Sequence, residues 1–214
     1  MIQIRRDGLT SDADEVGRLR SEFSEVQCTR LSQLLEPTLL GFLQGRLEEA
    51  EWEPKTHVGI GEELITNDLL ALHLLNFVAN LHGFRKLIEE VTGCGPLRRF
   101  RGRIYRMSAS AGHLDSWHDD NCDNRLIGMS LNLSPLPYCG GIFQLREWES
   151  QRMLAEVANT GLGDALVFRI SAELEHRVSP MEGEEAKTAF AGWFRPDLPD
   201  LFDELRGASS EKRS

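Results

Sequence analysis

Short strand-like runs separated by turn clusters dominate the second half of the chain and constrain its fold most strongly. Runs rich in β-branched and aromatic residues recur at 103–107, 126–133, 141–145, 164–170 and 188–194. Polar, Pro- and Gly-containing turn clusters stand at 121–124, 134–137 and 182–185. Short strands in series with turns between them are typical of antiparallel sandwiches and barrels. The sequence therefore predicts a mainly β core over about residues 96–196.

The first part of the chain, about residues 1–95, has the spacing of helices. Leucines recur at helical spacing between residues 19 and 52, and Pro37 suits the first turn of a second helix, where its missing N–H is not needed. Residues 67–92 carry one apolar face and end before Gly93, which predicts one helix with a glycine C-cap.

The two parts are expected to form a single domain. No low-complexity or Ser/Gly-rich linker lies near residue 95. The helices should therefore buttress the outside of the β core, within one domain over residues 1–206. The small polar residues of 207–214 predict a flexible tail.

The charge of the chain argues against nucleic acid as an obligatory partner. Thirty-four acidic residues against 24 basic ones give a net charge of −10, and such a protein repels phosphate backbones. The basic run 98–103 leads into a predicted strand, so we interpret it as a loop and strand edge.

Cysteine usage and hydropathy indicate a cytoplasmic protein that is not in a membrane. The four cysteines form no C-x-x-C pair, and such scatter suits a reducing compartment. The first residues lack the apolar run of a signal peptide. The most apolar stretch, 64–91, is interrupted by polar and charged residues, so it is not expected to span a bilayer.

Three polar positions in the strand-rich part carry candidate chemistry. His118 and Asp120 are two residues apart on an extended segment, so both side chains should point to one side while Asp119 points away. His176 lies on or just after the predicted strand at 164–170. Two histidines and a carboxylate form the facial triad of non-haem Fe(II) oxygenases. We therefore predict His118, Asp120 and His176 as catalytic metal ligands.

Lys187 opens the last predicted strand, eleven residues beyond His176. Its cation could hold the far carboxylate of a metal-chelating 2-oxoacid, and the hydroxyl of Thr188 could donate a further hydrogen bond. Taken singly, an H-x-D, a late histidine or a loop lysine is most often structural. Their common order, in register with the strands, makes the combined prediction more specific.

Further residues follow the pattern of a known family. They are Arg125, Leu131-Asn132, Gly140-Gly141-Ile142-Phe143, the run 163–168, His176-Arg177-Val178, Lys187 and Trp193. Together with the H-x-D at 118–120, this order resembles the iron- and 2-oxoglutarate-dependent dioxygenases, in particular their prolyl-hydroxylase-like branch, over about residues 103–195. The resemblance implies a double-stranded β-helix (jelly-roll) core buttressed by the N-terminal helices. Tyr105, Arg125, Lys187 and Thr188 are the candidate cofactor-binding residues.

The chain departs from the family pattern in places. Tyr105 lies thirteen residues before His118, farther than in the short Tyr-x-x-Gly step of many relatives. Ser130 stands where some relatives carry a tyrosine that touches the oxoacid. The usual arginine near the oxoacid is Lys187, a point charge that cannot form a bidentate fork.

The resemblance implies an oxygenase that uses Fe(II), 2-oxoglutarate and O₂, hydroxylates its substrate, and releases succinate and CO₂. Asp120 favours hydroxylation over halogenation, because a halogenase of this class needs that ligand position vacant. Peptidyl proline and a small metabolite are both open as substrates, and the oligomeric state is open too. Two alternatives are a non-catalytic jelly-roll protein that binds metal or 2-oxoglutarate as a sensor, and a cupin-like barrel with other metal chemistry.

Overall fold

The computed structural model describes residues 1–57, 60–111, 113 and 115–196 of the chain. The helices are α1 (Ala13–Val26), α2 (Pro37–Glu48), α3 (Leu69–Ala79), α4 (His82–Thr92) and the short 3₁₀ turn η1 (Ala109–Ala111). The strands are β1 (Gln3–Arg5), β2 (Gly8–Thr10), β3 (Cys28–Leu31), β4 (Trp52–His57), β5 (Gly61–Thr66), β6 (Arg99–Met107), β7 (Asp115–His118), β8 (Ile127–Asn132), β9 (Cys139–Gly140), β10 (Phe143–Glu147), β11 (Met153–Val157), β12 (Ala165–Arg169), β13 (Leu174–Val178), β14 (Met181–Glu182) and β15 (Lys187–Arg195).

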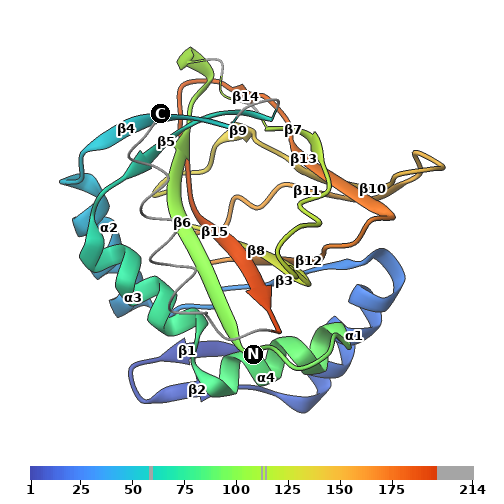
Figure 1. Ribbon diagram of the computed structural model, residues 1–214. Coiled ribbons are helices and arrows are strands. Elements are labelled where there is room, and N and C mark those ends of the chain that lie inside the picture. Colours follow the sequence, from blue (N-terminus) through green and yellow to red (C-terminus); the bar gives the residue numbers. More distant parts are fainter. Residues whose placement is uncertain (58–59, 112, 114, 197–214) are drawn as a thin grey trace.

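Eleven strands form one antiparallel sheet that folds back on itself (Figure 1). Its order is β11-β10-β13-β7-β5-β6-β15-β8-β12-β3, and β4 pairs with β5 outside this path. The folded sheet has two layers of strands, which meet where Gly61 of β5 pairs with Asp115 of β7. Side chains of β7, β10 and β13 face those of β6, β8 and β15 across a shared cavity. This nearly closed arrangement confirms the predicted jelly-roll core with a mainly β fold.

Alternation along β6 and β15 separates the helix-covered face from the cavity. The residues of these strands that pack in the large core with the helices are Phe100, Ile104, Phe190 and Phe194. The residues that line the cavity include Arg103, Tyr105, Lys187 and Trp193. Because successive strand side chains point to opposite faces, the pattern that anchors the helices also sets which polar groups enter the cavity.

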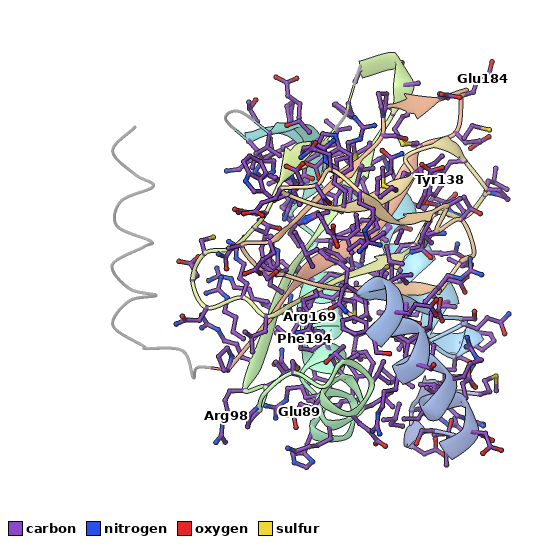
Figure 2. The ribbon with its side chains drawn as sticks, turned by 90° about the vertical axis from the view of Figure 1, so that its right-hand side faces the viewer. Glu89, Arg98, Tyr138, Arg169, Glu184 and Phe194 are labelled. Atoms are coloured by element: carbon purple, nitrogen blue, oxygen red, sulfur yellow. The ribbon has the colours of Figure 1, made fainter. Side chains whose placement is uncertain are left out.

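The helices cover one end of the sheet, as the side view in Figure 2 shows. Phe194 of β15 packs against Phe84 of α4, with ring centroids 6.1 Å apart. Tyr138 and Glu184 lie at the opposite end of the molecule from Phe194. The helices therefore buttress the sheet without closing the cavity.

Asn76 of α3 and Asn80, the C-cap of that helix, bind the edge of β6. The side-chain oxygen of Asn76 accepts a hydrogen bond from Gly102 N at 2.9 Å, and that of Asn80 accepts from Phe100 N at 2.8 Å. Asn80 Nδ2 also donates to Phe100 O at 2.8 Å. These bonds satisfy backbone groups of β6 that no neighbouring strand reaches, because β5 pairs with β6 only near Tyr105 and Arg106.

The predicted single helix over residues 67–92 is wrong, because α3 and α4 are separate helices. The chain breaks at Asn80 and Leu81, where Asn80 closes α3 as its C-cap and binds β6. The predicted Gly93 C-cap is confirmed, with a left-handed φ of 63°. Pro37 does lie in the first turn of α2.

The helical interpretation of the first part is also incomplete. Residues 28–31 form β3, which pairs with β12 at the end of the large sheet, so Leu31 belongs to a strand. Residues 52–66 contain the β4–β5 hairpin. Strand pairing holds both segments. β3 pairs with the distant strand β12, and β4 pairs with the neighbouring strand β5. The predicted strand at 141–145 starts only at Phe143, because Gly140 and Gly141 have positive φ.

None of the helices within the described ranges is long and apolar enough to cross a membrane. The tail predicted at 207–214 lies outside the described residues.

Gly192 of β15 pairs with Gly102 of β6, and the two backbones leave no room for a side chain. A Cβ at Gly192 would lie 2.1 Å from Arg101 O and 2.4 Å from Gly102 Cα. We expect Gly192→Ala to lower the free energy of unfolding by about 3 kcal/mol, measured by urea denaturation. The control is Gly45→Ala in α2, where a Cβ meets nothing within 4 Å and helix propensity favours a gain of about 0.5–1 kcal/mol. Equal unfolding midpoints for the two variants would contradict this account.

Candidate metal centre and its cavity

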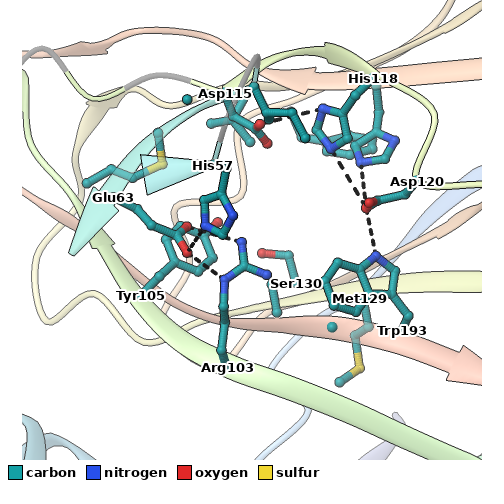
Figure 3. A pocket seen from close by; sticks show the side chains of 18 of the residues that line it. His57, Glu63, Arg103, Tyr105, Asp115, His118, Asp120, Met129, Ser130 and Trp193 are labelled. Atoms are coloured by element: carbon teal, nitrogen blue, oxygen red, sulfur yellow. Dashed lines mark hydrogen bonds and ion pairs between the residues drawn. The ribbon is translucent and has the colours of Figure 1, made fainter. Parts of the chain in front are cut away.

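His118, Asp120 and His176 converge from two chain segments, the end of β7 and β13, at one end of the cavity (Figure 3). One ligand atom from each lies within 4.8 Å of the others. Asp120 Oδ2 is 3.7 Å from His118 Nε2 and 3.5 Å from His176 Nε2. His118 pairs with His176 across β7 and β13, which fixes the two imidazoles side by side. The three residues predicted as ligands could therefore hold one metal ion.

The physical reason for the convergence differs from the strand alternation that predicted it. β7 ends at His118, and Asp120 adopts a left-handed backbone conformation with φ 54°. Aspartate tolerates this region better than most residues, and the turn brings the carboxylate back toward the imidazoles. Asp119 is exposed and accepts a hydrogen bond from Asn121 N, so it points away as predicted.

Hydrogen bonds fix the orientation of these three side chains. His118 Nδ1 lies 2.7 Å from Ser116 O, and since a carbonyl only accepts, Nδ1 carries a proton and Nε2 faces Asp120. Arg125 Nη1 donates to Asp120 Oδ1 at 2.6 Å, and Trp193 Nε1 donates to Asp120 Oδ2 at 2.7 Å. The Arg125 guanidinium stacks 3.8 Å from the Trp193 ring. Arg125 was predicted at the cofactor, and the structure places it on Asp120.

Burial and proximity perturb the titration of the cluster. Burial opposes ionisation of Asp120, but its contacts with the two histidines hold its pKa well below the usual range. Burial lowers the pKa of His176. Burial acts the same way on His118, yet Asp120 and Asp115 outweigh it and raise the pKa of His118 to about 9. The centre thus carries a preformed anionic ligand between two nitrogen ligands.

Lys187 lies on the cavity wall as a buried cation. Its side chain is 4% exposed, and Nζ donates to Gly141 O at 3.0 Å and lies 5.9 Å from the centroid of the Tyr138 ring. Burial lowers the pKa of Lys187 to about 8. No carboxylate of the described residues lies within ion-pair distance of it, so the site fits a carboxylate brought by a ligand.

The other two candidate cofactor-binding residues have different surroundings. Tyr105 is buried and lines the cavity, and burial raises the pKa of its hydroxyl. Thr188 lies on the opposite face of β15 and is absent from the cavity lining, because strand alternation turns it away from Lys187. Its hydroxyl accepts a hydrogen bond from Arg106 Nε at 3.1 Å. The position of Thr188 therefore does not support its predicted role.

A second polar group lies across the cavity from the metal centre (Figure 3). Arg103 donates from Nε to Glu63 Oε1 at 2.5 Å and from Nη2 to Oε2 at 3.2 Å. His57 Nε2 is 2.9 Å from Glu63 Oε1. Asp115 also lines the cavity, near His118. No motif or spacing in the sequence pointed to Glu63, His57 or Asp115, and Arg103 was interpreted only as part of the basic run 98–103.

The cavity has a volume of about 350 Å³, within the range of ordinary small-molecule sites. Its lining combines the metal centre, the Lys187 cation, the second polar group and apolar side chains such as Phe143 and Phe168. Such a site can hold a metal chelate with an anionic tail and still present a second molecule to the metal.

Comparisons with known proteins agree with this geometry. Residues 102–195 match the 2OG-Fe(II) oxygenase superfamily. A search of curated proteins finds no match.

Similar solved structures come from the same broad class. A Pseudomonas putida prolyl-4-hydroxylase superposes with a TM-score of 0.64 at 19% identity, covering 85% of this chain and 99% of that one. A Trichoplax adhaerens prolyl hydroxylase, in complex with a hypoxia inducible factor peptide fragment, gives 0.62 at 13% identity and covers 87% and 94%. The epimerase SnoN in complex with Fe³⁺, α-ketoglutarate and nogalamycin RO gives 0.62 at 13% identity and covers 89% and 92%. At these identities the likeness shows the fold.

Proposed function

We propose that the protein hydroxylates a substrate held in the cavity described above. The premise is that residues 102–195 make the chain a prolyl-hydroxylase-like member of the 2OG-Fe(II) oxygenase superfamily. Enzymes of this class use Fe(II), 2-oxoglutarate and O₂. His118, Asp120 and His176 are the proposed metal ligands, and Lys187 is the proposed partner of the distal carboxylate of 2-oxoglutarate. The observation that carries the proposal is the convergence of the three ligand atoms within 4.8 Å on the cavity that Lys187 also lines.

The residues of the chain have distinct tasks in this proposal. The bound metal and its co-substrates supply the oxidation of a C–H bond, with succinate and CO₂ as by-products. His118 presents Nε2 because Ser116 O holds the proton on Nδ1. Phe168 packs against the ring of His176 at 4.7 Å, and Phe143 stacks on it at 5.8 Å, so the buried imidazole keeps one orientation. Lys187 supplies one positive charge where the co-substrate has its second carboxylate.

An anaerobic titration tests the proposal directly. Fe(II) and 2-oxoglutarate added together to the protein should give a visible absorption band that neither gives alone, and admission of O₂ should then release succinate. Absence of the band would overturn the assignment of the site. A band without succinate under O₂, with or without candidate substrates, would indicate a protein that binds the co-substrate without turnover.

Neighbours of this fold were solved with a peptide and with a small molecule, so both substrate classes stay within the proposal. The location in the cell that the sequence predicts, the cytoplasm, is part of the proposal as well.

Trp193 is expected to tune the metal centre through Asp120. Trp193→Phe removes the 2.7 Å hydrogen bond to Oδ2 but keeps an aromatic ring against Arg125. Loss of such an outer hydrogen bond typically weakens metal binding by about tenfold or more. We expect a roughly tenfold rise in the Fe(II) dissociation constant, measured by anaerobic titration. Trp148→Phe is the control, since Trp148 is 59% exposed, and an equal change in both variants would refute the role.

The lowered pKa of Lys187 predicts an unusual pH dependence of co-substrate binding. The ammonium is present below about pH 8 in the free protein and is lost as the pH rises through that value, whereas an ordinary lysine keeps its charge to 10.5. Affinity for 2-oxoglutarate should therefore be level below pH 8 and fall by about tenfold per unit above it. Calorimetry on metal-loaded protein between pH 7 and 9 measures this. Lys187→Arg should flatten the profile, and a level profile in the unaltered protein would contradict the assignment.

A further inference from the structure

We propose that the substrate is a peptide with acidic residues beside the reacting residue, and that an arginine strip next to the cavity binds these carboxylates. The arginine strip consists of Arg99, Arg101 and Arg195, and it begins beside Arg103 and Trp193 at the edge of the cavity. The inference rests on the proposed oxygenase function and selects among its substrate classes.

The basic run 98–103 supplies most of this strip, because residues 99–103 lie in β6. Side chains of a strand alternate between its faces, and Phe100 packs in the core with the helices. Arg99, Arg101 and Arg103 therefore all point to the other face, which is the face of the cavity. Two residues of a strand rise about 6.6 Å, so this row of arginines extends over about 13 Å.

β15 continues the cavity wall into the arginine strip. Trp193 lines the cavity, as Figure 3 shows, and it pairs with Arg101 of β6. Arg195 pairs with Arg99 in the same register. The two members of each pair are direct neighbours on one face of the sheet. A ligand whose reacting part lies in the cavity therefore reaches the arginine strip by passing Trp193 on the same face.

Arg101 has the most open side chain of the strip. It is exposed, whereas Arg99 and Arg195 are partly buried. Among the described residues, none forms a hydrogen bond or an ion pair with the guanidinium of Arg101. Arg103, two residues away on the same face, instead binds Glu63 through two nitrogens. Arg101 is therefore the first arginine outside the cavity that can take a ligand carboxylate as its main partner.

The pair of Arg99 and Arg195 offers a second position for a carboxylate. The two residues lie directly opposite each other, and like charges in that arrangement repel. Arg195 lies 3.4 Å from Asp123, which is itself 60% exposed. A ligand carboxylate at this pair would lower the repulsion. Its distance along the strand from Arg101 is about 6.6 Å, the spacing of alternate residues in an extended peptide, so the strip fits acidic residues at alternate positions.

An acidic peptide suits this surface better than a nucleic acid does. A nucleic acid carries a phosphate at every nucleotide, and a chain with a net charge of −10 repels such a backbone. A peptide can confine its charges to the few residues that contact the arginine strip. The cavity of about 350 Å³ must also hold the co-substrate, so the flanking residues of a peptide lie outside it, where the strip is.

The chain carries acidic residues of its own directly after the strip. They are Asp197, Asp200, Asp203 and Glu204, and they lie outside the described residues. These side chains are the rival occupant that the experiment must separate from a substrate.

Peptide binding is measured by fluorescence anisotropy under argon, on the full chain loaded with Fe(II) and 2-oxoglutarate, so that no turnover occurs. The probes are short end-blocked peptides with a central proline and with aspartates at alternate positions either before or after it. Each is compared with the same peptide carrying asparagines. At least one aspartate peptide should bind about five- to tenfold more tightly than its asparagine counterpart, as expected for two or three exposed ion pairs. Added salt should reduce this difference.

Matched variants assign the preference to the arginine strip. Arg101→Gln should reduce the preference for aspartate by about two- to fivefold, the effect of one exposed ion pair. Arg101→Lys keeps the charge and should retain most of the preference. Arg18→Gln is the control, because Arg18 lies on α1 and is 60% exposed. Turnover of 2-oxoglutarate without substrate should be the same in all three variants.

A fourth variant tests the rival occupant. It combines Asp197→Asn, Asp200→Asn, Asp203→Asn and Glu204→Gln in the full chain, and its affinity for the aspartate peptide should stay within about twofold of the unaltered protein. A rise of about tenfold would show that the chain's own acidic residues occupy the strip, and it would overturn the assignment to a substrate.

Other outcomes would also overturn the inference while the proposed function stands. They are the absence of binding by every peptide, equal binding of aspartate and asparagine peptides, and an undiminished preference in Arg101→Gln. Displacement of the aspartate peptide by a lower concentration of a single-stranded oligonucleotide would assign the strip to nucleic acid instead. Failure of the oxygenase function itself would appear separately, as a missing visible band before any peptide is added.

Discussion

Replacing His118, Asp120 or His176 by alanine is expected to abolish iron binding and 2-oxoglutarate turnover while the protein stays folded. Each change leaves two protein ligands where three converge within 4.8 Å, and two are too few to hold Fe(II) firmly. Removal of Asp120 also leaves Arg125 with no carboxylate at 2.6 Å. Bound iron is measured after anaerobic loading and desalting, and succinate formation is measured without substrate. Both should fall by at least a hundredfold.

The neighbouring Asp119 provides the control for this set. It carries the same side chain one residue away but is exposed and bonds only to the turn backbone at Asn121 within the described structure. Asp119→Ala should therefore keep its iron and its turnover. Full activity in His176→Ala would show that the third ligand is misassigned.

The second large effect is expected at Lys187. A buried ammonium that pairs a carboxylate contributes about 1.5–3 kcal/mol, so Lys187→Ala should raise the apparent constant for 2-oxoglutarate by about ten- to a hundredfold. Fe(II) binding should change little, because Lys187 does not contact the three ligands. Titration of 2-oxoglutarate in the succinate assay and of Fe(II) under argon separates the two effects.

Two further variants sharpen the Lys187 result. Lys187→Arg keeps the charge with a different shape, so part of the affinity should remain. Lys55→Ala removes an exposed lysine of β4 and should have no effect. An unchanged constant in Lys187→Ala would move the carboxylate contact to another cation and weaken the case for 2-oxoglutarate.

The strand-rich core was predictable because its signals are local. The runs at 103–107, 126–133 and 188–194 overlap β6, β8 and β15, whose apolar side chains alternate with the residues that enter the cavity. The helical part was predicted less well. Asn80 ends α3 because its side chain bonds to Phe100, twenty residues away, and no spacing rule within 67–92 contains that contact.

The spacing argument that predicted the proposed metal ligands differs in part from the physical reason for their convergence. An H-x-D spacing picked out residues that do converge, but the left-handed turn at Asp120 makes the geometry. Arg125 contacts Asp120, and Thr188 faces away from the cavity. Neither position was predicted, because a pattern of residue types does not specify the side of a strand or the partner of a cation.

Glu63 and His57, which the β4–β5 hairpin brings to the cavity, were missed by the sequence reasoning. Glu63 and His57 lie in a hairpin whose outer face is exposed, so its apolar alternation is weak. Gly59 and Gly61 were the available turn signal in the sequence.

The hydrogen bonds from Asn76 and Asn80 to β6 protect the edge of this strand from pairing with strands of other molecules. Four residues of helix rise about 6 Å, and two residues of strand rise about 6.6 Å, so the two amides meet Gly102 and Phe100 in step. A strand edge with unpaired backbone groups is a template for another molecule's strand, and here helix side chains occupy that template. The asparagines therefore act as a gatekeeper against edge-to-edge aggregation, and they do so at the strand that carries Arg103 and Tyr105 into the cavity.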